Sequence, residues 1–248
     1  MALFQVNFYS KALAQNTSFN VILPESCPRS DIPTVYLLHG MFGDHTDWCR
    51  RTGIERYADK RRVAVVMPDG ENSFYADMKY GKKYFTYVSE ELVAYTRRVF
   101  RLSRKREKTF VCGLSMGGYG AFLLALRKPE QYGACASLSG CVDIAEVLEY
   151  APDPDAPIPV WGEDFRTSVK GSVSDLKWLV ENFPKDAPKP RMFSVCGRQD
   201  SLYQNCLGFR DFMEDKDFSF TYREGDGAHT WGFWDAWICP ALDFLLER

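Results

Sequence analysis

TFVCGLSMGGYG, at residues 109–120, joins a run typical of a buried strand to the first turn of a helix. Residues 109–112 are apolar or β-branched and are followed by glycine, as in an internal strand of a parallel sheet. Residues 121–127 (AFLLALR) favour a helix that Pro129 closes. Between these runs lies a Gly-x-Ser-x-Gly motif with Ser115 at its centre. The stretch therefore predicts a strand, a sharp turn that presents Ser115, and a helix.

Such a turn suits a nucleophile, because the serine Oγ stands above the sheet at the N-terminus of a helix. The helix dipole and its free N–H groups favour negative charge that develops there. Gly113 and Gly117 leave room where strand and helix cross closely. The motif is weak on its own, and the alternative is a glycine turn in which Ser115 only caps the helix. The strand before it and the helix after it favour the nucleophile.

Length and charge narrow the class of protein. The chain has 248 residues and a net charge of −2, which fits a single α/β domain over residues 1–248. The charge gives no reason to expect nucleic acid as a partner, and no apolar run is long enough to span a membrane. The basic run 101–108 could bind an acidic partner, but it feeds the amino end of a strand, which favours a solvated turn.

The cysteines and the N-terminus predict a cytoplasmic protein. Eight cysteines are scattered without metal-ligand spacing, and no secretion signal precedes the first strand. We therefore expect reduced thiols, no metal and no cofactor. A nucleophilic cysteine is a further alternative, but none has a histidine positioned for it in the sequence.

Alternating and apolar runs predict a mostly parallel sheet with helices on both faces. Residues 3–10 and 17–23 favour an antiparallel pair at one edge, and residues 34–39, apolar on both faces, favour a central strand. Further strands are predicted at 62–67, 132–139, 191–196 and 219–222, and helices at 53–61, 89–100, 208–215 and 231–246. Ser89 is expected to cap the second of these helices.

Two loops follow strands at the carboxyl edge of this sheet, where open α/β sheets place their sites. The loop 40–48 would supply a second oxyanion donor, so the candidates are the N–H groups of Met41 and Met116. A plain strand-to-helix loop is the alternative. Residues 71–84 are expected to form either one wall of the site or a solvated loop.

The segment 141–190 is predicted to be a cap-like insertion, because it gathers prolines and aromatics between two late strands and holds an amphipathic helix at 172–182. Caps of this kind commonly cover the cleft. Trp161 and Phe165 are candidate substrate contacts, although aromatics in such segments more often pack. Trp231, at the start of the closing helix, is a third candidate.

A serine nucleophile needs a base, and the base needs an acid that fixes its tautomer. The chain order Ser, acid, His leaves only His229 among the three histidines, because His39 and His45 precede Ser115. Asp200 directly follows a strand and is the first choice for the acid. The other candidates are Asp226, which is very close to His229 in the chain, and Asp143. His39 is expected to orient the 40–48 loop, and His45 has no assigned role.

The motifs LHGMFGDHTDW (38–48) and GLSMGG (113–118) together resemble the esterase D / tributyrin esterase family (EstA-like). That family is related to feruloyl and acetyl esterases and to S-formylglutathione hydrolases. The resemblance implies an α/β-hydrolase fold and a metal-free serine esterase of short acyl groups. It implies the nucleophile Ser115, the acid Asp200 and the base His229, with oxyanion amides at Met41 and Met116. The segment 140–190 matches least, and such segments set substrate choice.

The sequence therefore predicts a cytoplasmic carboxylesterase that cleaves acetyl or butyryl esters, or acetylated or feruloylated sugars, through an acyl-enzyme. Its partner would be a small-molecule or oligosaccharide ester, and a homo-oligomer is compatible with the sequence. The first alternative is S-formylglutathione hydrolase, with Arg198 or the lysines near Gly81 holding the glutathione carboxylates. An acyltransferase and a non-catalytic binding protein of the same fold are also compatible with these motifs.

Overall fold

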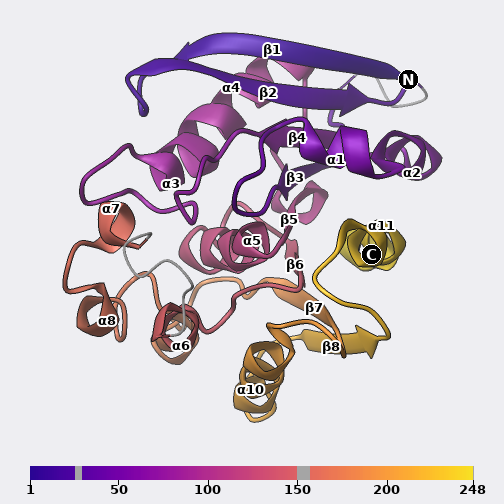
Figure 1. The fold of residues 1–248 in the computed structure, drawn as a ribbon. Helices are drawn as coiled ribbons and strands as arrows, with labels where there is room; N and C mark the ends of the chain where they lie inside the picture. The colour runs from indigo at the N-terminus through magenta and orange to yellow at the C-terminus, as the bar shows by residue number, and fades with distance from the viewer. Residues whose placement is uncertain (26–29, 150–156, 248) are drawn as a thin grey trace.

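The computed structural model describes residues 1–25, 30–149 and 157–247, so residues 150–156 of the predicted insertion lie outside the described residues. The strands are β1 (Ala2–Ser10), β2 (Gln15–Leu23), β3 (Thr34–Leu38), β4 (Ala64–Pro68), β5 (Thr109–Leu114), β6 (Ala134–Leu138), β7 (Arg191–Gly197) and β8 (Phe220–Gly225). They form one sheet in the order β1-β2-β4-β3-β5-β6-β7-β8 (Figure 1). Whether the chain forms a single domain stays a prediction.

Strand β5 lies near the middle of the sheet, between β3 and β6. Both neighbours are parallel to it, with Thr34 opposite Thr109 and Phe110 opposite Ala134. Every residue of β3, β5 and β6 is buried. Strands that are apolar on both faces need a helical layer on each side, which explains why the central strands were predictable from composition.

The antiparallel part of the sheet lies at one edge, as the sequence predicts. Strand β1 pairs with β2, and β2 continues antiparallel to β4. On the other side of β4 the strands β3, β5, β6, β7 and β8 all run parallel. The carboxyl ends of these strands therefore lie along one edge of the sheet.

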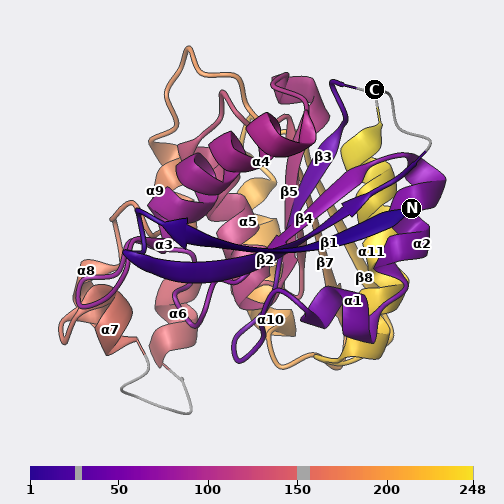
Figure 2. The same cartoon turned by 90° about the horizontal axis from the view of Figure 1, so that it is seen from above.

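Helices cover both faces (Figures 1 and 2). One face carries α1 (Asp47–Arg51), α2 (Ile54–Arg61) and α11 (Trp231–Leu246); the other carries α3 (Tyr84–Thr86), α4 (Leu92–Phe100), α5 (Met116–Arg127) and α10 (Tyr203–Met213). The apolar side chains beneath each layer form a separate buried cluster. None of the described helices combines the length and the apolar character needed to cross a membrane.

The helix predicted at 89–100 begins earlier than expected. It starts at Tyr84 and passes through the π-helical turn η1 (Tyr87–Glu91) before α4, so Ser89 lies inside the helix and is not a cap. The Glu91 carboxylate accepts hydrogen bonds from the N–H groups of Lys11 (2.7 Å) and Ala12 (3.2 Å) at the β1–β2 turn. This contact between distant segments has no signal in the local sequence.

The described part of the insertion contains α6 (Ile144–Glu149), α7 (Ile158–Trp161), α8 (Phe165–Ser168) and α9 (Leu176–Glu181). Its α9 begins after Asp175, whose carboxylate accepts the N–H groups of Lys177 and Trp178. Backbone hydrogen bonds join Lys79 N–H to Val160 (2.9 Å) and Tyr80 N–H to Pro159 (3.0 Å). The insertion is therefore fastened to the loop that follows β4.

The basic run 101–108 is a turn in which Arg101, Arg104, Lys105 and Glu107 are exposed, as predicted, but it also carries side chains that bind neighbouring loops. Arg106, in the 3-10 turn η2 (Arg106–Lys108), donates to the carbonyls of Pro129 (2.7 Å) and Lys189 (2.9 Å). Lys108 forms an ion pair of 2.7 Å with Asp31. These side chains hold loops together at the amino ends of the strands.

The crossing of β5 and α5 should tolerate no added side chain. A Cβ at Gly117 would lie 2.6 Å from the carbonyl oxygens of Leu38 and His39, so Gly117→Ala forces the helix away from the sheet. We expect this substitution to lower the free energy of unfolding by about 2–3 kcal/mol in urea denaturation. Gly208→Ala is the control, because a Cβ there meets nothing within 4 Å. It should raise the stability by about 0.5–1 kcal/mol, and equal stabilities would contradict the crossing.

Candidate active site

Ser115 occupies the turn between β5 and α5 in a rarely populated backbone conformation. Its φ is +52° and its ψ is −120°, a combination that costs free energy in a residue with a side chain. Two backbone hydrogen bonds of 2.9 Å hold the turn, from Ser115 N–H to Leu138 and from Gly118 N–H to the Ser115 carbonyl. The side chain is only partly buried. The sharp turn predicted from the Gly-x-Ser-x-Gly motif is confirmed.

The structure brings Ser115, His229 and Asp200 together. His229 Nε2 lies 3.0 Å from Ser115 Oγ, and its Nδ1 lies 3.0 Å from each carboxylate oxygen of Asp200. The three side chains follow β5, β8 and β7, which end at the same edge of the sheet. Because a carboxylate only accepts hydrogen bonds, Nδ1 must carry the proton, and the Nε2 lone pair faces the serine hydroxyl.

Asp200 is buried, with 6% of the residue exposed. Burial alone would raise the pKa of its carboxyl. Hydrogen bonds from His229 and from Leu202 N–H (2.9 Å) outweigh burial and hold this pKa below its usual value. Asp200 is therefore a carboxylate at neutral pH.

Sequence reasoning missed two residues that support this group. The indole N–H of Trp234 donates to Ser139 Oγ (3.2 Å), and the Trp234 ring packs edge-on against His229 at 4.9 Å between centroids. Ser139 is buried and has a φ of +48°, and its hydroxyl also helps to lower the pKa of Asp200. The only signal in the sequence is that Ser139 ends a predicted strand.

The two predicted oxyanion donors belong to two different segments, the start of α5 and the loop after β3. Met116 is the first residue of α5, so its N–H belongs to the helix N-terminus. A Cβ added to Gly40 would lie 3.3 Å from the Cβ of Ser115, so the peptide that leads into Met41 passes beside the serine. Both N–H groups therefore come from backbone that borders Ser115.

His39 ties the Met41 loop to the loop after β4. Its Nε2 accepts the N–H of Gly70 (2.8 Å), its Nδ1–H donates to the Gly40 carbonyl (2.7 Å), and its own carbonyl accepts the Tyr75 hydroxyl (2.9 Å). Burial lowers the pKa of His39, which keeps the ring neutral and able to accept from Gly70. These contacts fit the predicted structural role.

The other candidate acids, Asp226 and Asp143, and the candidate cysteine nucleophile are bound or buried in ways that differ from Asp200 and Ser115. Asp226 is exposed and pairs with Arg198 (3.0 Å), and Asp143 pairs with Lys177 (2.5 Å). The Cys141 thiol lies 3.7 Å from the Ser115 carbonyl, but burial raises its pKa to about 12, so it is not a thiolate at neutral pH. The seven cysteines in the described part of the chain are free thiols.

His45, which has no role assigned from the sequence, lies in the loop 40–48 that also carries Met41. Its Nδ1 is 3.8 Å from Asp69, beyond hydrogen-bonding distance, and its carbonyl accepts the Asn20 side chain (3.0 Å). Within residues 1–25, 30–149 and 157–247, no three His, Cys, Asp or Glu side chains are grouped so that they could hold a metal ion.

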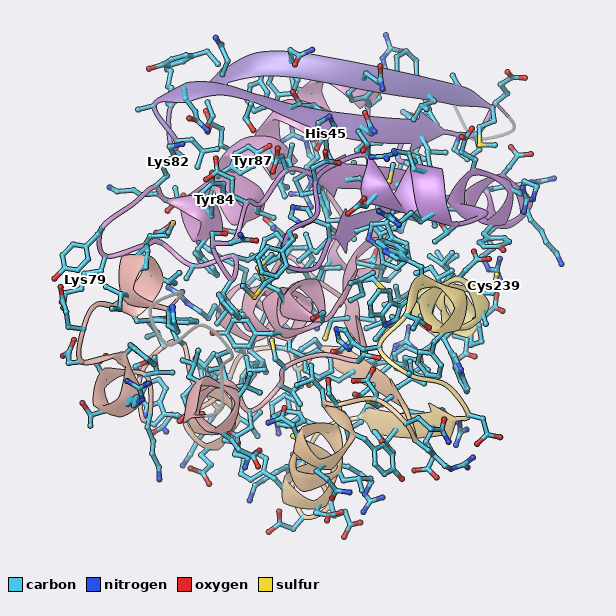
Figure 3. All side chains as sticks on the ribbon, viewed as in Figure 1. His45, Lys79, Lys82, Tyr84, Tyr87 and Cys239 are labelled. Carbon is cyan, nitrogen blue, oxygen red and sulfur yellow. The ribbon has the colours of Figure 1, made fainter. Side chains whose placement is uncertain are left out.

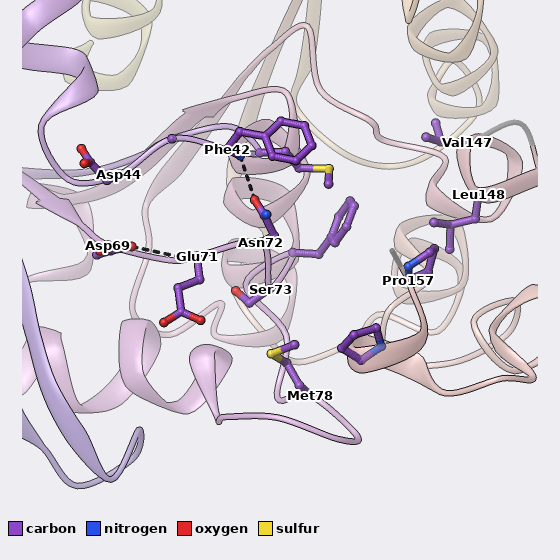
Figure 4. Close-up of a pocket in the computed structure, with 14 residues that line it drawn as sticks. Phe42, Asp44, Asp69, Glu71, Asn72, Ser73, Met78, Val147, Leu148 and Pro157 are labelled. Carbon is purple, nitrogen blue, oxygen red and sulfur yellow. Dashed lines mark hydrogen bonds between the residues drawn. The ribbon is translucent and has the colours of Figure 1, made fainter. Parts of the chain in front are cut away.

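A pocket of about 810 Å³ opens beside Met41 (Figure 4). One wall comes from the loop after β4, including Asn72, Ser73, Phe74 and Met78, so part of the 71–84 segment lines a pocket next to Met41. The facing wall comes from the insertion. It consists of Val147, Leu148, Pro157 and Pro159.

The three aromatic residues proposed as substrate contacts have different places. Phe165 is buried in the core with 1% of the residue exposed, so it is not kept as a substrate contact. Trp161 packs behind Phe74, with ring centroids 5.0 Å apart, and donates to Ser174 Oγ (3.0 Å). Trp231 is half-buried beside Trp234, at 5.3 Å between centroids, on the His229 side of the serine.

The comparisons with known proteins point to one family. A family profile described as "putative esterase" matches residues 10–245. An acetyl esterase of Caldicellulosiruptor saccharolyticus is 34% identical over 261 residues, which cover 99% of this chain and 98% of that protein. The Staphylococcus aureus fluorophosphonate-binding serine hydrolase FphF matches with a TM-score of 0.92 and 30% identity, covering 100% of this chain and 99% of that one. The S-formylglutathione hydrolase FrmB of the same organism matches with a TM-score of 0.90 and 31% identity, covering 99% of both chains.

The neutral state of His39 should make the protein less stable in mild acid. Because its pKa in the folded protein lies below the usual 6.5, the unfolded chain binds the proton more readily. The free energy of unfolding is then at its full value above about pH 6.5. It falls as the pH drops toward the pKa that His39 has in the folded protein, by at most about 1.4 kcal/mol per pH unit. When urea denaturation is repeated across this pH range, the free energy of unfolding should change less steeply with pH in His39→Gln than in the wild type. Parallel slopes would contradict a buried neutral His39.

Proposed function

Because the chain belongs to this esterase family, we propose that it is a serine carboxylesterase in which Ser115, His229 and Asp200 form the catalytic triad. Membership makes the protein a carboxylic ester hydrolase with a fold of the α/β-hydrolase type, as the sequence predicts. The observation that carries the assignment of residues is the continuous chain of 3.0 Å contacts from Ser115 Oγ through His229 to Asp200.

Acylation begins at Ser115. Its Oγ attacks the ester carbonyl carbon while His229 Nε2, 3.0 Å away, takes the hydroxyl proton. The carbonyl oxygen becomes an oxyanion between the N–H groups of Met41 and Met116, and the α5 N-terminus adds a favourable dipole. Asp200 stabilises the imidazolium that forms and keeps His229 in the required tautomer.

His229 then returns the proton to the leaving alcohol, and the bond between the carbonyl carbon and the alkoxy oxygen breaks. The acyl group remains on Ser115. In the second half of the reaction His229 takes a proton from water, the hydroxide attacks the acyl carbon, and the serine hydroxyl is restored as the acid leaves. Each half needs the same two N–H groups and the same histidine.

Acetyl and other short acyl esters are the proposed substrates, including acetylated or feruloylated sugars. The 34% identical acetyl esterase supports this choice, because the match covers nearly all of both chains. A small-molecule or oligosaccharide ester is the proposed partner. A cytoplasmic location and a homo-oligomer also remain proposals.

The similarity to FrmB is the reason to consider a thioesterase as the alternative. A glutathione thioester carries two carboxylates that need cationic partners. Arg198, the first cation predicted for that task, already binds Glu224 (2.9 Å) and Asp226 (3.0 Å). Lys79 binds Asp164 (3.2 Å) at the outer edge of the molecule beside α7, and Lys82 lies 3.5 Å from Glu71 (Figure 3). These pairings favour an ester over glutathione thioesters.

A purely binding role and an acyl-transfer role have less support than hydrolysis. A non-catalytic binding protein has no need for the strained Ser115 turn or for the contacts of His229. An acyltransferase would have to favour an alcohol over water at the acyl-enzyme. Product analysis with added methanol separates this reaction from hydrolysis.

Ser115→Ala should abolish esterase activity. We expect kcat/KM for p-nitrophenyl acetate to fall by about 10⁴-fold or more, because the acyl-enzyme can no longer form. Ser137→Ala is a matched control on the neighbouring strand β6, where the buried hydroxyl has no hydrogen-bond partner, and it should remain active. Full activity of the Ser115 variant would refute the assignment. Activity of the wild type on S-formylglutathione but not on esters would select the thioesterase.

Asp200→Asn should identify the acid. The amide cannot stabilise the imidazolium and can turn its NH₂ toward His229, so kcat should fall by about 10³–10⁴-fold. Asp226→Asn removes only an exposed carboxylate that pairs with Arg198, and kcat should change by less than about twofold. If the two substitutions had the opposite effects, Asp226 would be the acid.

A further inference from the structure

The pocket beside Met41 is bordered by the insertion, and none of its described lining comes from the loop that carries His229 or from α11. This lining comes from residues 41–44, from residues 69–78 and from the insertion; it reaches the serine through Met41, which follows the Gly40 that borders Ser115, and it includes none of Ser115, His229 and Trp231. Figure 1 shows the insertion helices α6 and α7 and the helix α11 on opposite sides of α5. Trp231 belongs to the α11 side, where it packs against Trp48 at 5.5 Å between centroids.

This placement decides which half of an ester the pocket receives. In the tetrahedral intermediate the carbon carries Ser115 Oγ, the oxyanion, the leaving oxygen and the acyl chain. The leaving oxygen must stay within reach of His229 Nε2 to be protonated, so the acyl chain points away from His229. We infer that the pocket is the acyl site and that it selects a bulky, uncharged acyl group. The inference rests on the proposed function and extends its substrates beyond acetyl and butyryl esters.

Phe42 gives the pocket an unusual open surface. Its ring is 87% exposed, although burial of a phenylalanine is worth about 1.5–3 kcal/mol. The residue has a φ of +64°, and its N–H donates to the Asn72 side chain (2.8 Å). Figure 4 shows this hydrogen bond beneath the ring, with Val147, Leu148 and Pro157 across the pocket. An acyl group between these walls would cover the ring that the free protein leaves in water.

The volume fits a larger acyl group than acetyl. The pocket is open to solvent and has a volume of about 810 Å³, whereas the methyl of an acetyl group displaces on the order of one water, about 30 Å³. Pockets in the range of roughly 300–1,000 Å³ suit ligands of drug size. Acetyl esters would react but would leave most of the apolar wall without a contact.

The end of the pocket that lies away from Val147, Leu148 and Pro157 is acidic. Asp44, Asp69 and Glu71 line it, with Lys82 at 3.5 Å from Glu71. Burial would raise the pKa of Asp44, but the hydroxyl and N–H of Thr46 hold it below its usual value. Burial would also raise the pKa of Asp69, but the neighbouring His45 ring and the hydrogen bond from Glu71 N–H outweigh burial, so this pKa is lowered too. Both groups are carboxylates at neutral pH, and they repel an anionic acyl group.

The first experiment varies the acyl group and the alcohol separately. One series holds p-nitrophenol constant and runs from acetate to octanoate; the other holds acetate constant and varies the alcohol from phenyl to naphthyl and benzyl. For the wild type we expect kcat/KM for octanoate to be at least as high as for acetate. Val147→Trp should lower the octanoate-to-acetate ratio about tenfold by filling the half-buried wall. Phe42→Ala should lower it about fivefold by removing the apolar surface.

Val173→Trp is the matched control, because Val173 is 50% exposed on the same insertion and does not line the pocket. It should leave the octanoate-to-acetate ratio unchanged. If Val147→Trp fails to fold, Phe42→Ala still tests the inference, because truncation of an exposed side chain should leave the fold intact. If both pocket variants instead altered the alcohol series and left the acyl ratio intact, the pocket would be an alcohol site.

The second experiment tests charge at constant length. Mono-p-nitrophenyl suberate differs from p-nitrophenyl octanoate by a carboxylate at the far end of the acyl chain. At neutral pH we expect its kcat/KM to be lower by about tenfold or more. Glu71→Gln should recover about threefold of this difference by removing one negative charge, whereas Glu181→Gln, on the exposed end of α9, should recover none. Equal rates for suberate and octanoate would overturn the selection against charge. Failure of the proposed function would look different, because Ser115→Ala would then still hydrolyse the acetate.

Discussion

The close crossing of β5 and α5 is the constraint on which the site depends. A Cβ at Gly113 would lie 2.3 Å from the Gly117 carbonyl oxygen, so only glycine allows the helix to start so near the strand. The chain reaches that crossing through Ser115, whose positive φ turns its side chain out of the sheet. The same geometry aims the N-terminus of α5 at the place where an oxyanion would form. Close packing of two glycines thus sets the position of the hydroxyl and of one N–H donor together.

The buried carboxylate of Asp200 provides the second fixed point. A charge out of water is stable only when hydrogen bonds replace its solvent, and His229 and Leu202 N–H do so here. The same bond that stabilises the carboxylate fixes the His229 tautomer, which leaves Nε2 free to face Ser115. Trp234 supports the ring from the side. Residues that follow three different strands therefore act as one unit, because the parallel sheet ends them at a common edge.

The sequence revealed the features that depend on local pattern or on elimination. Buried strands such as β3 and β5 were predictable because residues apolar on both faces have no other stable place. His229 followed from chain order, since only one histidine comes after Ser115. The π turn at Tyr87–Glu91, the Ser139 support and the bond between Phe42 and Asn72 were not predictable, because each is fixed by contacts between segments far apart in the chain. Likewise, the choice of Asp200 over Asp226 and Asp143 gained its support only when the partners of each carboxylate were known.

Catalysis and acyl selection share one short loop. The Met41 N–H, proposed for the oxyanion, and the Phe42 ring, proposed for the acyl group, belong to adjacent residues. The loop is held from one side by the His39 bonds to Gly40 and Gly70, and from the other by Asn72. An acyl group that packs on Phe42 therefore presses on the peptide next to the oxyanion donor. Contact energy gained far from the reacting carbon can then improve the alignment of the Met41 N–H, which is how remote binding is converted into rate.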